Sequence, residues 1–173
     1  MCRHWKKSPS RFLTSFFAEP SRWDIVYGRF PYREARASPG QDFHPCLVLD
    51  VYREQSTRTP WVIVAFGTSR NVRDLRSGQF SVLPEHGAAF AKTGLTHPTK
   101  FSLARDRVAK LPYNDGWFAV PPQLRQWQAH PSIGLFDIKR YSLAIKAAGK
   151  SARIVGTLLD LETLALGAVP DIE

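Results

Sequence analysis

Two long, almost uninterrupted apolar segments constrain the fold of this chain more than any other feature. They are HPCLVLDVYR at 44–53 and PWVIVAFGTS at 60–69, and both contain β-branched and aromatic side chains. Such residues favour strands, and a strand that is apolar on both faces must be covered on both faces. The polar connection EQSTRT between them is hairpin-like. The two segments are therefore expected to lie at the centre of a small barrel or sandwich.

Shorter segments on either side predict the remaining strands and helices. Strands are expected at 23–30, 79–84, 98–104, 107–113 and 132–136, and helices at 85–95 and 137–148. One or two helical turns are expected around Arg11–Ala18. Short strands at close spacing, with helices at the edges, predict a mainly β (α+β) fold: a compact barrel with short edge helices and a C-terminal helix.

The length of the chain fits one domain. Its 173 residues suffice to bury a core without disulfide or metal staples. We expect an N-terminal extension at 1–22, a barrel domain at 23–150 and a helical tail at 151–173. The tail carries apolar residues at helical spacing, but the same segment would equally suit pairing with a partner.

The charge balance points to an anionic partner. Lys and Arg number 24 against 15 Asp and Glu, which gives a net charge of +9 and a pI near 9.9. Nucleic acid, an acidic protein and an anionic membrane surface all suit that sign. The simpler alternative is that the excess charge only keeps the protein soluble.

The cysteine content indicates a reducing compartment. There are two cysteines: Cys2 near the N-terminus and Cys46 inside an apolar, strand-like segment. This number argues against a disulfide scaffold, and no segment has the apolar length of a membrane span or of a secretory signal. We therefore expect a cytoplasmic protein. The histidines and cysteines show no metal-ligand spacing, so no cofactor is expected.

Four segments also occur in an order that is typical of one known family. They are WDIVYGRFPYRE (23–34), HPCLVLD (44–50), VIVAFGTS (62–69) and AKTGLTHPTKF (91–101). The family has a "GDIV" strand, an "RPALVL" strand, a strand ending in "TS" and a later "GL…T" element. Over roughly residues 22–145, the chain thus resembles the PemK/MazF family of toxin endoribonucleases.

This resemblance implies a fold, an activity and partners. Family members are small SH3-like barrels that usually act as homodimers, and an acidic antitoxin restrains them. They cleave single-stranded RNA without a metal: the ribose 2′-hydroxyl attacks the adjacent phosphate and leaves a cyclic phosphate and a 5′-hydroxyl. Such chemistry needs a base, an acid and groups that stabilise the pentacoordinate phosphate.

The resemblance also implies catalytic positions. Thr68, with Ser69 beside it, matches the catalytic Thr of "TS", and its alternative role is to cap the end of a strand. His44 stands where the family has the Arg of "RPALVL". An imidazole can act as acid or base near neutral pH, but it cannot form the permanent bidentate phosphate clamp of a guanidinium. A purely structural role for His44 is the alternative.

Basic residues cluster near these positions and are candidate RNA-binding residues. Those expected to contact the RNA backbone are Arg70, Arg73, Arg76, Arg29, Arg33 and Lys100, and the candidates for stacking on bases are Tyr27, Phe30 and Tyr32. Core packing for the aromatic residues, and a solvated face for the arginines, is the alternative. Trp117 and Phe118 are expected in the core.

Two functions follow from these observations. The first is a toxin-like endoribonuclease. The second is a catalytically inactive binding module that keeps the basic barrel and binds RNA, DNA or an acidic regulatory protein, as a host or phage regulatory factor would. Metal-independent RNA cleavage distinguishes the first function from the second, which predicts salt-sensitive binding without new RNA ends.

Overall fold

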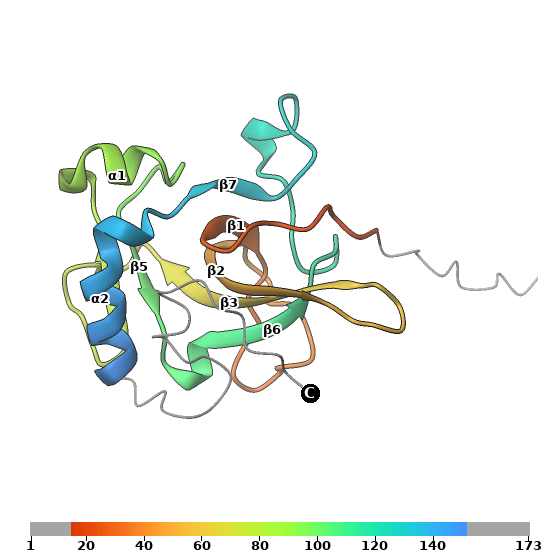
Figure 1. Cartoon of the computed structure of the whole chain (residues 1–173), viewed down its shortest axis with the longest axis horizontal. Coiled ribbons are helices and arrows are strands. Elements are labelled where there is room, and N and C mark those ends of the chain that lie inside the picture. Colours follow the sequence, from red (N-terminus) through yellow and green to blue (C-terminus); the bar gives the residue numbers. More distant parts are fainter. Residues whose placement is uncertain (1–14, 152–173) are drawn as a thin grey trace, which may run out of the picture.

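The computed structural model describes residues 15–151, which form one curled antiparallel sheet with two helices at its side (Figure 1). The strands are β1 (Asp24–Gly28), β2 (His44–Arg53), β3 (Pro60–Thr68), β4 (Gln79–Val82), β5 (Thr99–Ser102), β6 (Val108–Pro112) and β7 (Ser132–Leu135). The helices are α1 (Ala88–Ala91) and α2 (Ile138–Ser151), and 3-10 turns span Pro84–His86, Arg105–Arg107 and Pro122–Leu124. The predicted mainly β (α+β) class, with edge helices and a helix near the C-terminal end of the domain, is confirmed.

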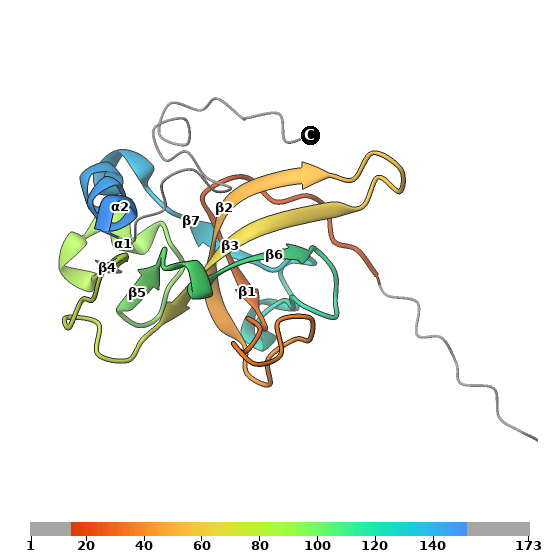
Figure 2. The same ribbon diagram turned by 90° about the horizontal axis from the view of Figure 1, so that it is seen from below.

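The sheet is organised around β3. The strand order is β4-β5-β3-β2-β1-β7, and β6 pairs with the first half of β3. The second half of β3 pairs with β5 instead. Because the two halves of β3 pair with different strands on the same side, the sheet bends into a half-barrel. β2 and β3 form a long twisted hairpin within it (Figure 2).

Two apolar clusters explain why the central strands are apolar at successive positions. Along β2, Cys46 and Val48 belong to one cluster, and Leu47 and Leu49 to the other. β3 alternates in the same way. Since successive side chains of a strand point to opposite faces, each face of the hairpin has its own core. Cys46 is a free, fully buried cysteine, which acts as a small apolar side chain.

Helix α2 covers one of these clusters. Its buried residues Tyr141, Ile145 and Ala148 pack on the cluster that contains Leu47. The end of α2 is tied to the turn before β4, where the Gly78 amide donates to Ser151 Oγ over 2.8 Å. Within residues 15–151, no helix is both long and apolar enough to cross a bilayer.

Several predicted elements differ at their ends from those observed, for identifiable reasons. The first strand begins at Asp24 because Trp23 has a φ of 72°, which extended backbone does not allow. The predicted helix at 85–95 is wrong as one unit: Gly87, with a φ of 59°, separates a 3-10 turn from α1. The last helix continues beyond 148 to Ser151.

The helical turns predicted around Arg11–Ala18 are wrong where the structure describes them. Phe16 forms a β-bridge with Asn114, and the Phe17 amide donates to the Tyr113 carbonyl over 3.0 Å. This segment therefore has an extended backbone and pairs with the residues that follow β6. Residues 1–14 and 152–173 lie outside the described part of the chain, and so do Cys2 and nearly all of the predicted helical tail.

One close backbone contact holds β7 against the turn that follows α1. Gly94 has a φ of 67°, and a Cβ added there would lie 1.8 Å from the Ile133 carbonyl oxygen. Gly134 meets the same turn from the other side, where an added Cβ would lie 2.3 Å from the Thr93 carbonyl carbon. Only glycine permits this approach, and it places residues 94–97 beside the strand ends described below.

We expect Gly94→Ala to lower the free energy of unfolding more than Gly87→Ala. Both glycines have positive φ, so each substitution costs about 1–3 kcal/mol in backbone strain. An added Cβ at Gly87 meets nothing within 4 Å, whereas at Gly94 it collides with β7. Urea unfolding of the two variants measures the difference, and equal losses would contradict the close contact.

Candidate functional site

Register brings polar side chains from several strands into one row. The β2–β3 pairing joins Cys46 to Phe66, and the same register continued by two residues places His44 opposite Thr68. Thr68 is paired on its other side with Lys100 of β5. Directly opposed residues of antiparallel strands point to the same face. His44, Thr68 and Lys100 therefore lie side by side across three adjacent strands.

A cleft of about 980 Å³ opens at this row. Its lining includes His44, Thr68, Ser69 and Arg70 from the strand ends. The opposite wall comes from residues 94–97, after α1, and from the segment around the third 3-10 turn. All the residues predicted to be catalytic thus meet in one cavity, together with one predicted RNA-binding arginine.

Two smaller pockets flank this cleft. One, of about 210 Å³, is lined by Arg70, Arg76 and Lys100 among others. The other, of about 380 Å³, is lined by residues of the loop after β1, including Arg33. Phe66 and Arg107 line the cleft and both pockets. These two side chains therefore lie where the cleft and the two pockets meet, and the three spaces together are called the groove below.

His44 lies in the wall of the cleft, in contact with an aromatic ring. Its imidazole centroid is 4.9 Å from that of Phe66. Burial lowers the pKa of His44 below its usual range, and the positive charges of Arg70 and Arg107 lower it further, while Asp42 opposes them. The neutral imidazole, which can accept a proton, is therefore the favoured form at neutral pH.

Thr68 has the local role that its position at a strand end predicts. Its Oγ1 accepts a hydrogen bond of 3.2 Å from the backbone amide of Arg70, which closes the turn after β3. A hydroxyl that accepts one bond still has a proton to donate. The turn thus orients the Thr68 hydroxyl, and Ser69 beside it also lines the cleft.

The predicted RNA-binding residues divide into two groups. Arg70, Arg76, Lys100 and Arg33 line the groove. Arg73 and Arg29 line none of its three pockets.

Those two arginines are engaged elsewhere. Arg73 pairs with Glu85, and Arg29 donates to the Gly40 carbonyl over 2.9 Å and lies over the Phe43 ring. Each therefore stabilises a loop, and contact of either residue with RNA stays a prediction.

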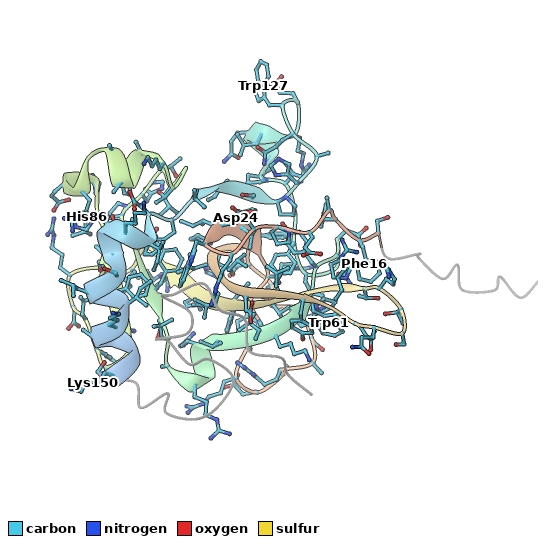
Figure 3. The ribbon with its side chains drawn as sticks, in the orientation of Figure 1. Phe16, Asp24, Trp61, His86, Trp127 and Lys150 are labelled. Carbon is cyan, nitrogen blue, oxygen red and sulfur yellow. The ribbon has the colours of Figure 1, made fainter. Side chains whose placement is uncertain are left out.

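The aromatic residues also differ in accessibility. Phe30 is 4% exposed and belongs to the core, although it also lines the same pocket as the exposed Tyr32, and Tyr27 lines the cleft. Tyr27 stacks on Phe43 at a centroid distance of 5.0 Å. Phe118 is fully buried and Trp117 packs against the same cluster, as predicted. Trp127 is exposed at the tip of the loop before β7, away from the sheet (Figure 3).

Three groove residues were not predicted as site residues from the sequence. Arg107 lies just before β6, and its guanidinium carbon is 5.1 Å from the Phe66 ring centroid. His97 brings a second imidazole into the cleft, where its Nδ1 is 2.9 Å from Thr96 Oγ1. Phe66 appears in the sequence only as one more apolar strand residue. No sequence signal separates these three from their neighbours.

Comparisons with protein-family models and with curated proteins find no match to this chain. Within residues 15–151, no group of three or more His, Cys, Asp or Glu side chains is placed to hold a metal ion.

The charges around His44 make a prediction that does not depend on function. Arg107→Gln removes a positive charge and should raise the pKa of His44, whereas Asp42→Asn removes a negative charge and should lower it. Titration of the His44 imidazole by NMR measures both shifts. Shifts of the same sign in the two variants would contradict the arrangement of charges.

Proposed function

We propose that this chain is a metal-independent endoribonuclease of the PemK/MazF type that cleaves single-stranded RNA. The observation that carries the proposal is that His44 and Thr68 share one cleft with Arg70 and Arg107. Among the described residues, neither guanidinium has an ion-pair partner, so both positive charges are available to an anionic substrate. The resemblance in the order of the four sequence segments supports the same function.

In the proposed reaction, the neutral imidazole of His44 acts as the general base. The 2′-hydroxyl gives its proton to the imidazole while its oxygen forms a bond to the adjacent phosphorus. The bond from phosphorus to the 5′-oxygen breaks, and that oxygen takes up a proton. Atoms and charge balance when the products are a 2′,3′-cyclic phosphate and a 5′-hydroxyl, without a co-reactant.

The other groups of the cleft stabilise the transition state. Arg70 and Arg107 bring positive charge to the equatorial oxygens of the phosphate, and the Thr68 hydroxyl donates a hydrogen bond to one of them. The guanidinium that position 44 lacks is thus supplied from other segments. His97, in the same cleft, is the proposed source of the proton for the leaving 5′-oxygen.

The alternative function is binding without cleavage. The cleft and the pocket of about 210 Å³ suit an RNA or DNA strand or an acidic regulatory protein, since the permanent charges that line these two spaces are mostly positive. A homodimer and an acidic antitoxin stay predictions from the resemblance. RNA cleavage decides between the two functions, because an inactive module would bind RNA in a salt-sensitive manner and leave its length unchanged.

We expect the purified chain to cleave defined single-stranded RNAs in the presence of EDTA. His44→Ala and Thr68→Ala should each lower kcat/KM by about 100-fold or more, which is typical of the loss of an acid–base group or of a transition-state donor. Denaturing electrophoresis with analysis of the new ends provides the measurement. Intact RNA after incubation with the wild-type chain would refute the enzyme.

Two control variants separate chemistry from folding. Thr68→Ser keeps the hydroxyl and should retain most of the activity. His130→Ala removes an exposed imidazole that lines none of the three pockets, and its activity should equal that of the wild type. A loss in His130→Ala as large as that in His44→Ala would argue against a specific role for His44.

The pH dependence of cleavage provides a further test. The base must be neutral, so kcat/KM should rise with pH through the pKa of His44, which burial and neighbouring cations lower. The midpoint of the rise is therefore expected below about pH 6.5. Asp42→Asn should move the midpoint to still lower pH, and a shift to higher pH would contradict His44 as the base.

A further inference from the structure

Lys100 is a buried cation whose hydrogen-bonding capacity is mostly unused within the described residues. Its side chain belongs to β5, and the residue is 9% exposed. The ammonium donates one hydrogen bond, of 2.9 Å, to the backbone carbonyl of Asp74. An ammonium has three donors, and burying a charge is unfavourable unless it is paired. The position therefore calls for a negatively charged partner.

The pocket around Lys100 has the composition of an anion site. Of its ionisable lining residues, Lys100, Arg70, Arg76 and Arg107 are basic and Asp74 is acidic. Among residues 15–151, none of the three arginines has an ion-pair partner. The pocket has a volume of about 210 Å³, which is smaller than the roughly 300 Å³ of the smallest typical ligand pockets. A single phosphate group fits such a space better than a whole nucleotide.

We propose that this Lys100 pocket binds the RNA phosphate next to the one that is cleaved. Thr68 lines both the pocket and the cleft, and β3 pairs it directly with Lys100. Neighbouring strands are about 4.8 Å apart, so the backbone of Lys100 lies one strand spacing from that of Thr68, at which the reacting phosphate is proposed to bind. The inference rests on the proposed function for the identity of its ligand, an RNA strand.

The pocket makes a specific demand on the substrate. A linkage is cleaved efficiently only if the chain carries a further phosphate on the side of β5. Arg70 and Arg107 line the pocket as well as the cleft, so two adjacent phosphates share these two guanidiniums. The Lys100 ammonium contacts only the second of them, which makes Lys100 a binding residue rather than a catalytic one.

The experiment uses ligands that cannot be cleaved. Dinucleotides of 2′-deoxyribose are prepared without a terminal phosphate, with a 5′-phosphate and with a 3′-phosphate, and the Kd of each is measured at low salt by NMR titration. We expect the phosphate at one of the two ends to tighten binding by about tenfold, typical of a hydrogen bond to a charged group. Equal affinities for all three ligands in the wild type would overturn the proposal.

Lys100→Met tests the residue itself, since Met keeps the buried apolar stem and removes the charge. It should abolish the gain from the terminal phosphate and weaken binding of the unphosphorylated ligand much less, because the ammonium acts on that ligand only through longer-range attraction. The matched control Lys146→Met, at an exposed site on α2, should keep the gain. A gain that persists in a folded Lys100→Met variant would overturn the proposal.

A second variant keeps the test decisive if Lys100→Met does not fold. Arg76→Gln changes an exposed residue of the same pocket and should reduce the gain from the terminal phosphate. An undiminished gain would then overturn the proposal. Because these ligands lack the 2′-hydroxyl, their binding is independent of cleavage. Failure of the nuclease function would appear separately, as intact RNA.

Discussion

The register between β2 and β3 is the constraint on which the rest of the structure depends. Side chains alternate between faces, so a slip of one residue would exchange the two apolar clusters and move His44 and Thr68 to opposite faces. A shift of register between Val48 and Asp50 inserts one residue and bends the hairpin. Both faces of the hairpin are buried, which makes the register, and with it the polar row, energetically specific.

Some of the basic side chains bind other groups of the protein, and others have no ion-pair partner among the described residues. Arg53 and Arg73 form ion pairs with nearby carboxylates, and Arg36 donates hydrogen bonds to two backbone carbonyls around the second 3-10 turn. Exposed pairs of this kind contribute little to stability. Arg70 and Arg107 have no such ion pair among the described residues and face the groove. Net charge alone therefore favours an anionic partner only in general terms, and the groove is the proposed place of binding.

How much of this architecture could be predicted depended on the range of the interactions. Both central strands were predicted within one residue of their ends, because their apolar pattern is local and long. The segment at 85–95 has helical composition, but the backbone of Gly87 divides it. Around Phe16, pairing with Asn114 replaced the expected helix. In both places, a tertiary contact or a backbone conformation prevailed over propensity.

By itself, the sequence determined the β-rich class, the central hairpin and the candidate pair His44 and Thr68, because these depend on local composition and on the order of segments. Only the tertiary structure decided which distant residues join that pair. Arg107 and His97 reach the groove through a 3-10 turn and a glycine contact, whose orientation no periodicity encodes. The burial of Lys100 likewise depends on the loop after β3, whose Asp74 carbonyl accepts a hydrogen bond from the ammonium, since exposure is a property of the fold rather than of a residue.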